Sequence, residues 1–340
     1  MKTSSKLFLH APGVHVGGGL TLLRALYSTR RMCVDFEQID TRAAQRIPPS
    51  SAERHLIRPS ILSRLVAEVR LQRRAVKGDV VLCFHGLPPL LRLQGNVTVF
   101  LQNRLLISTT SLHNYSLKTR IRLTMERFLI KSLAHRVNKF IVQSPSMAEQ
   151  VRGYLGAGVN VVVCPYIGDF DSPSALTDHE RIFDFIYIAS DDPHKNHNAL
   201  LLAWCHLAEQ GIRPSLALTL SFDSPLSARV ADLKERWGLN ITNLGLFAQE
   251  ELGSFYAQAN ALIYPSFTES LGLPLIEASR AGLPIVAAEL DYVRDVVEPV
   301  ETFDPQSYTS IARAVKRHLG MVSTTQPIYG PEVFLREVLQ

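Results

Sequence analysis

Short apolar runs alternate with longer amphipathic patterns through the first half of the chain. The runs are bounded by turn or helix signals, as is typical of parallel strands whose two faces are both covered. They occupy residues 6–10, 80–84, 97–101, 140–143 and 159–164. Helical patterns cover residues 60–76, 115–137 and 146–154, and a glycine-rich segment leads from the first strand into a helix that starts near Leu20. These patterns predict one layered domain in which strands and helices alternate.

A second alternation follows a polar, proline-containing stretch, in which we place a linker at residues 169–180. Its strands are expected at residues 183–189, 215–220, 241–244, 261–264 and 284–287, and its helices at 198–209, 225–237, 250–258 and 274–281. The predicted domains are residues 1–168 and 181–329, with a last helix at about 330–340 that packs back on the first domain. Two such domains in tandem predict a ligand-binding cleft at the carboxyl ends of their strands.

Composition narrows the class of protein. With 46% hydrophobic and 20% charged residues among 340, the chain is neither disordered nor collagen-like. Its four cysteines form no C-x-x-C pair, which argues against a structural zinc site and indicates a reducing compartment. No apolar run approaches the roughly 18 residues that span a bilayer. We therefore expect a cytoplasmic protein that is neither exported nor transmembrane.

Charge is distributed unevenly between the two halves. Residues 1–170 hold 24 Lys and Arg against 9 Asp and Glu, whereas residues 171–340 hold 12 against 22. The predicted helix at 115–137 is basic and carries an apolar stripe, namely Leu117, Ile121, Phe128, Leu129 and Leu133. In one interpretation this helix simply covers the sheet. In the other, it docks the protein on the anionic inner face of the cytoplasmic membrane. Nucleic acid is not an expected partner, because no aromatic platforms are interleaved with the charges.

The segment from Ile263 to Ala287 carries the strongest chemical signal. A predicted buried strand ends at Tyr264, and Pro274 suits the first turn of the following helix. The free amides at the start of that helix predict an anion site. Glu269 precedes the helix and Glu277 lies in its predicted opening turn, so both carboxylates are expected to face one cleft. A single such glutamate is commonly a capping residue, but a pair in this loop favours a functional site.

The spacing of the two glutamates, E-S-L-G-L-P-L-I-E, resembles the E-x7-E signature of the family-4 retaining glycosyltransferases. Other segments follow in that family's order: F-I-Y-I-A-S-D-D-P-H-K-N-H-N-A-L, then N-L-G-L-F-A-Q-E-E-L-G-S-F-Y-A-Q-A-N-A-L-I-Y-P-S, then F-D-P. The resemblance covers residues 183–320 and implies the GT-B architecture. In that α/β architecture, two Rossmann-like doubly wound domains face a central cleft.

The resemblance also implies roles for individual residues of the second domain. Glu269 would face the hydroxyls of the donor sugar, Glu277 would hold the ribose, and Lys195 would neutralise the leaving diphosphate. The diphosphate would also meet the helix start, whose residues are Ser270, Leu271, Gly272 and Leu273. Phe247 is expected either on the nucleobase or in the core.

The sequence departs from the family pattern at Ala189, where the family usually has an arginine six positions before the lysine. Either His194 or an arginine of the basic domain, such as Arg104, replaces that cation, or Lys195 and the helix amides act alone. Loss of activity is a further alternative, against which the retained glutamates and lysine argue.

The first domain contributes its own candidates. The resemblance places Gly17, Gly18 and Gly19 across the cleft, where absent side chains let backbone amides approach the donor. Their spacing does not support a nicotinamide or flavin site. Gln102 and Asn103 follow a predicted strand and are expected to orient acceptor or sugar.

The sequence therefore predicts retaining transfer of a sugar from a nucleoside diphosphate donor to a saccharide or lipid-linked saccharide. The expected setting is bacterial lipopolysaccharide, O-antigen or capsule synthesis, with GDP-mannose as a first candidate donor. No metal or other cofactor is expected, because no D-x-D pair is placed to hold an ion. A nucleotide-sugar epimerase or a phosphorylase on the same fold, and a nucleic-acid-binding protein, are the alternatives.

Overall fold

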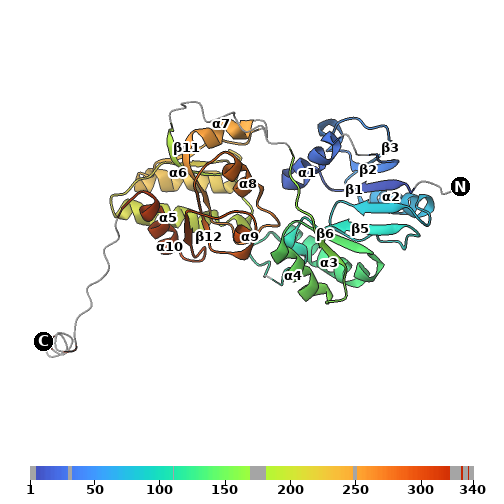
Figure 1. The fold of residues 1–340 in the computed structure, drawn as a ribbon. Helices are drawn as coiled ribbons and strands as arrows, with labels where there is room; N and C mark the ends of the chain where they lie inside the picture. The colour runs from blue at the N-terminus through green and yellow to red at the C-terminus, as the bar shows by residue number, and fades with distance from the viewer. Residues whose placement is uncertain are drawn as a thin grey trace.

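The computed structural model describes residues 5–29, 33–109, 111–168, 181–247 and 251–321, together with Pro331 and Arg336. Two α/β bodies follow one another along the chain (Figure 1). The predicted linker at 169–180 lies outside the described residues, as does the predicted final helix at 330–340 apart from Pro331 and Arg336.

The first body is built on a seven-stranded sheet in the order β3-β2-β1-β4-β5-β6-β7, and every neighbouring pair is parallel. Its strands are β1 (Leu7–Ala11), β2 (Phe36–Asp40), β3 (Glu53–Ile57), β4 (Val80–Cys83), β5 (Asn96–Phe100), β6 (Lys139–Val142) and β7 (Val161–Val163). Its helices are α1 (Gly17–Ser28), α2 (Ile61–Arg74), α3 (Leu117–Leu133) and α4 (Pro145–Leu155), with short 3-10 turns η1 (Ala44–Arg46), η2 (Arg104–Leu106) and η3 (Ala134–Arg136). Residues of α2, α3 and α4 share one hydrophobic cluster, whereas α1 packs in another.

The second body has a six-stranded parallel sheet in the order β10-β9-β8-β11-β12-β13. Its strands are β8 (Phe183–Tyr187), β9 (Leu216–Leu218), β10 (Ile241–Asn243), β11 (Ala259–Tyr264), β12 (Ile285–Ala288) and β13 (Glu301–Phe303). Its helices are α5 (His197–Glu209), α6 (Pro225–Trp237), α7 (Leu252–Ala257), α8 (Leu273–Arg280), α9 (Asp291–Arg294) and α10 (Tyr308–His318), and η4 covers Pro193–Lys195. The prediction of two doubly wound domains is confirmed.

Serine side chains start several of these helices. Each accepts a hydrogen bond from the backbone N–H three residues further on, as in the pair Ser144 and Met147 at the start of α4. Proline follows in the first turn of α4, α6 and α8, where its missing N–H costs no intrahelical bond. The remaining serine caps are Ser60, Ser116, Ser224 and Ser307.

The predicted glycine loop before α1 needs a correction, because the helix begins at Gly17 and not near Leu20. Gly17 turns the chain with a φ of 62°, in the region that favours glycine. Gly18 and Gly19 then form part of the first turn despite their low helix propensity. A Cβ at Gly18 would make an ordinary contact with Leu273, whereas one at Gly19 would lie only 3.1 Å from Gln102 Oε1, so close packing favours glycine at position 19.

Candidate functional site

A cavity of about 110 Å³ lies between the two bodies. Four of its residues follow β5 of the first sheet, and the others belong to η4 and to the loop between β11 and α8. They are Gln102, Asn103, Arg104, Leu105, His194, Thr268, Glu269 and Ser270. The loops beyond β5, β8 and β11 therefore meet at one place, as expected for the carboxyl ends of parallel strands.

Lys195 does not itself line the cavity, but it forms an ion pair with Glu269 of the cavity wall, with 2.7 Å between Nζ and Oε1. Their side chains are only 15% and 12% exposed, so the pair is largely shielded from solvent. Asn196, the next residue, has a left-handed φ of 61° and donates from its side chain to the carbonyls of Pro265 and Pro305. The backbone N–H of Phe267 also donates to the His194 carbonyl at 2.8 Å. These bonds fix the two loops to each other and so set the position of the pair.

The start of α8 offers unpaired backbone donors. Gly272 takes a φ of 72° before the helix, and a side chain there would stand 2.9 Å from Leu275 Cδ1. Within the described residues, no acceptor within hydrogen-bonding distance meets the amides of Ser270, Leu271, Gly272 or Leu273. Leu271 is buried, and Leu273 packs against the first-domain cluster that contains α1. Such a helix start attracts anions, because the free N–H groups and the helix dipole act together.

Glu277 is almost fully buried, with 4% of its surface exposed. It lies in the second turn of α8 and not in the opening turn, because the helix already begins at Leu273. The Tyr256 hydroxyl donates to its Oε2 at 3.0 Å. Burial raises the pKa of the Glu277 carboxyl, although this hydrogen bond opposes the shift. Glu277 is not among the residues that line the cavity beside Glu269.

Three buried tyrosines pack behind the ion pair and were not predicted from the sequence. Tyr187 donates to the Lys195 carbonyl at 2.6 Å, and Tyr292 donates to the Ser266 carbonyl at 2.7 Å. The Tyr264 hydroxyl is buried and has no hydrogen-bond partner within the described residues. Burial, and then the nearby Glu269 carboxylate, raise its pKa well above the usual range. Tyr187 is the last residue of β8, and Tyr264 is the last residue of β11. A hydroxyl-bearing side chain at the end of an apolar strand was therefore the sequence signal that could have identified them.

The first domain contributes Gln102 and Asn103 to the cavity wall. The Gln102 side chain donates to the Phe84 carbonyl at 2.6 Å, while its own Oε1 is buried without a partner in the described part of the chain. Asn103 caps η2, because its Oδ1 accepts from the Leu105 N–H at 3.0 Å. Gln102 therefore keeps a free acceptor at the cavity, whereas the oxygen of Asn103 is used locally.

Both candidates for the cation missing at Ala189 lie at the cavity. Arg104 donates to the Glu269 carbonyl at 3.4 Å across the two bodies and to Gln150 Oε1 at 2.6 Å. His194 Nδ1 lies 3.1 Å from the Tyr115 hydroxyl, and burial lowers the pKa of the imidazole. A neutral imidazole supplies no charge at pH 7, so the guanidinium is the better cation.

Phe247 lies away from this cavity and packs in the second domain. Its ring centroid is 4.6 Å from that of Phe255, and the ring contacts the main core cluster. Among the described residues, no group of three His, Cys, Asp or Glu side chains is arranged to hold a metal ion. The described helices also include none whose length and apolar character would let it cross a bilayer.

Comparison with known proteins gives a family match for the second half of the chain. Residues 172–321 match the family model of glycosyl transferases group 1. The O-antigen chain mannosyltransferase B of Escherichia coli is 33% identical over 116 residues, which are 33% of this chain and 30% of that protein. The chain spans less than a third of the length of the curated relatives it matches first.

Solved structures share the fold over nearly the whole chain. Sucrose-phosphate synthase from Thermosynechococcus elongatus superposes with a TM-score of 0.68 at 17% identity and covers 93% of this chain and 90% of that one. Anabaena HepE in complex with UDP and glucose gives a TM-score of 0.64 at 16% identity with the same coverage. The fold is therefore GT-B, with two Rossmann-like domains.

Proposed function

We propose, from the premise that residues 172–321 belong to the glycosyl transferases group 1, that this protein transfers a sugar from a nucleoside diphosphate to a saccharide or lipid-linked saccharide. The observation that carries the proposal is the ion pair of Lys195 and Glu269 beside the free amides of α8, with Arg104 approaching from the other domain. Cations and amides suit a diphosphate, and carboxylates suit sugar hydroxyls.

The proposed reaction exchanges one bond at the anomeric carbon for another. The bond from that carbon to the diphosphate oxygen breaks, the acceptor oxygen takes its place on the same face, and the acceptor proton goes to the departing diphosphate. Negative charge grows on the leaving group, and Lys195, Arg104 and the α8 amides are held ready to stabilise it. Glu269 would bind the sugar and Glu277 the ribose. No protein base and no metal ion are required in this scheme.

A mannosyl donor such as GDP-mannose is the first candidate, and the likeness to the O-antigen chain mannosyltransferase B of Escherichia coli supports it. The fold relative bound to UDP and glucose makes a uridine donor the next candidate. We place the reaction in O-antigen, lipopolysaccharide or capsule synthesis at the cytoplasmic side of the membrane, with retention of the anomeric configuration.

The test begins with thermal shifts against GDP-, UDP-, dTDP- and ADP-sugars, followed by NMR of the product formed from the stabilising donor. Transfer to a saccharide with the donor's anomeric configuration is expected. An inverted product would contradict retention. Conversion of labelled donor without acceptor would favour an epimerase, and phosphate-dependent cleavage a phosphorylase. Salt-sensitive binding of DNA or RNA without donor binding would contradict the transferase.

A further inference from the structure

Helix α3 exposes an apolar stripe to solvent. Its members recur every three or four residues and are 57% to 69% exposed: Leu117, Ile121, Met125 and Phe128. The opposite side of the helix supplies Leu123 and Ile130, which are fully buried in the first-domain core. The helix thus has one apolar side that packs on the sheet and a second that no described residue covers.

Helix α2 repeats this arrangement. Five of its apolar residues are between 37% and 80% exposed: Ile61, Leu62, Leu65, Val66 and Val69. Ala67 and Leu71 face the core instead. Single exposed apolar residues are ordinary on a protein surface, but two helices that each expose a row of them mark an interaction site.

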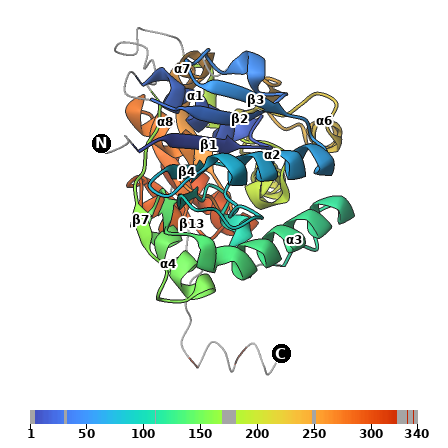
Figure 2. The same cartoon turned by 90° about the vertical axis from the view of Figure 1, so that its right-hand side faces the viewer.

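The two rows belong to one side of the molecule. Helices α2 and α3 cover the same face of the sheet, and Figure 2 shows both turned toward the viewer. The loop between β4 and β5 contacts α2, because Gln72 donates to the Arg92 carbonyl, and it contacts the η3 turn that follows α3, because Arg136 donates to the Leu90 carbonyl. We call the nine exposed apolar residues of these helices the α2–α3 face.

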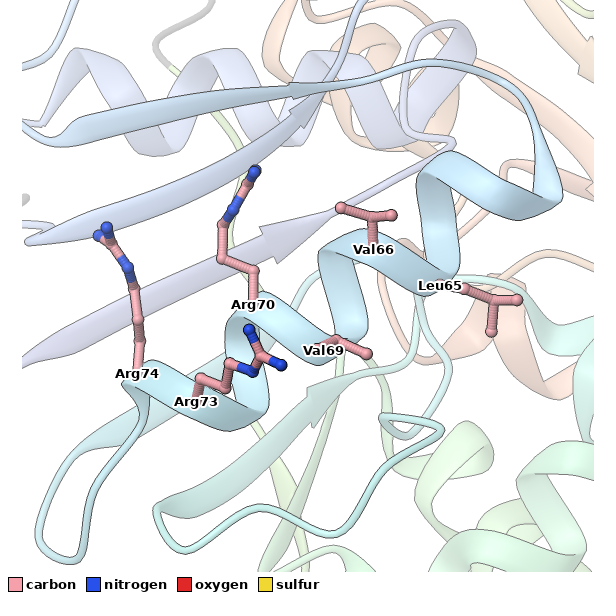
Figure 3. Close-up of a pocket in the computed structure, with 6 residues that line it drawn as sticks. All are labelled: Leu65, Val66, Val69, Arg70, Arg73 and Arg74. Atoms are coloured by element: carbon pink, nitrogen blue, oxygen red, sulfur yellow. The ribbon is translucent and has the colours of Figure 1, made fainter.

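Positive charge surrounds the α2–α3 face. Within the two helices, all of whose residues the structure describes, the only acids are Glu68, which is fully buried, and Glu126, which pairs with Arg122. The exposed cations are Arg73, Arg74, Lys118, Arg120, Arg122 and Lys131. Of these, Arg74 pairs with the exposed Glu53 of β3 and Arg122 with Glu126. A hollow of about 480 Å³ on α2 combines both characters (Figure 3). Its apolar lining is Leu65, Val66 and Val69, and its cationic lining is Arg70, Arg73 and Arg74.

The α2–α3 face also reaches the candidate site. Its most exposed residues, Ile61, Leu62 and Leu117, lie in the first turns of their helices, at the carboxyl edge of the sheet. Tyr115, two residues before α3, contacts His194 of the cavity. A surface bound to this face would therefore lie beside the place where acceptor is expected.

We propose that the α2–α3 face docks on an anionic lipid bilayer, with the apolar rows entering the interface and the arginines and lysines binding lipid phosphates. Apolar residues interleaved with an excess of cations over acids fit this partner, whereas the cores of protein interfaces are depleted of charge. This docking rests on the proposed function, because the lipid-linked acceptor that it would serve belongs to that proposal. Docking places such an acceptor at the open edge of the cleft.

The test is co-sedimentation of the full chain with phosphatidylcholine vesicles, with and without phosphatidylglycerol. The variant Ile61→Asp/Leu117→Asp adds charge in first helical turns, where a carboxylate is favourable to the helix, so folding is retained. The matched control is Val300→Asp, at a 58% exposed position of the second domain. We expect the wild type and the control to bind vesicles with phosphatidylglycerol in a salt-sensitive way, and the double variant to bind at least about tenfold less.

Three outcomes would overturn the proposal. These are equal binding to both vesicle types, unchanged binding by the double variant, and self-association that the double variant abolishes while vesicles are not bound. Sugar transfer to a water-soluble acceptor, measured without vesicles, keeps the proposed function separate. We expect the double variant to retain that transfer. If the wild type binds vesicles but transfers no sugar, the proposed function is contradicted and the docking proposal is not.

Discussion

The ammonium group of Lys195 lies 2.7 Å from Oε1 of Glu269, in a site where both side chains are mostly buried. The pair joins a cation suited to a phosphate with a carboxylate suited to sugar hydroxyls. Each group satisfies the other, so neither is left as an unpaired buried charge. Donor binding would then exchange this internal contact for contacts with its diphosphate and sugar.

Replacing Lys195 by alanine should remove charge stabilisation of the leaving diphosphate. We expect kcat to fall by about 100- to 1,000-fold, the usual effect of losing one preorganised group at a developing charge. Steady-state kinetics with the identified donor measures this change. Lys234→Ala, at an exposed position of α6, is the matched control and should leave kcat unchanged. Equal activity of both variants would remove Lys195 from the mechanism.

Glu277→Gln should separate stability from donor binding. Burial raises the pKa of Glu277 above 4.5, so the folded state binds the proton more tightly than the unfolded state. The charged carboxylate therefore destabilises the fold above that folded-state pKa, and the cost disappears as the pH falls to about 4.5. The glutamine variant should be about 1 kcal/mol more stable at pH 7 and equal to wild type near pH 4.5.

Urea denaturation at the two pH values measures the stability difference, and calorimetric titration measures donor affinity. The variant should bind donor at least about tenfold more weakly, since a neutral amide is a weaker acceptor for ribose hydroxyls than a carboxylate. A variant less stable than wild type at pH 7 would show that the carboxylate stabilises the fold. Unchanged affinity would remove Glu277 from the donor site.

The apolar periodicity was sufficient to predict most of the parallel strands, but not β2, β3 and β13. The residues of β2, F-E-Q-I-D, are all buried, including three polar ones. Glu37 accepts from Tyr27, Ser50 and Arg54, so its burial is compensated by partners distant in the sequence. A pattern of polarity cannot reveal such partners, because they come together only in the folded chain.

The candidate site, too, could be predicted from the sequence only in part. Motif spacing led to Lys195 and Glu269, which the structure brings into contact. The approach of Arg104 to the Glu269 carbonyl depends on how the two domains face each other, which local sequence does not encode. Tyr187 and Tyr264 are concealed by their place at the ends of apolar strands, and Tyr292 lies in α9. The α9 helix, β13 and α10 were not predicted, although β13 ends at Phe303, the first residue of the F-D-P motif.

Gly19→Ala should disturb Gln102 without improving the helix. The added Cβ would lie 3.1 Å from Gln102 Oε1, and the Gln102 amide is already held by the Phe84 carbonyl. We expect transfer to fall by about tenfold, because a small displacement of a substrate-positioning group is costly to rate. Kinetics and urea denaturation measure both effects.

The matched control is Gly153→Ala, in the exposed interior of α4, where a Cβ meets nothing within 4 Å. That variant should gain about 0.5 to 1 kcal/mol of unfolding free energy with unchanged transfer. If Gly19→Ala gained similar stability and kept full activity, close packing against Gln102 would not be the reason for glycine at position 19.

Arg104→Ala should distinguish the two candidates for the cation absent at Ala189. Arg104 lies at the cavity on the first domain. Burial lowers the pKa of both groups, but the guanidinium starts from so high a value that it stays charged at pH 7, whereas the His194 imidazole is neutral there. We expect the alanine variant to raise the KM for donor at least about tenfold. Arg104→Lys should raise KM less, because it keeps the positive charge but loses the planar set of guanidinium N–H donors. Arg313→Ala, at an exposed position of α10, should leave KM unchanged. A normal KM in Arg104→Ala together with a raised one in His194→Ala would assign the role to the histidine, and the diphosphate would then be bound by the second domain alone.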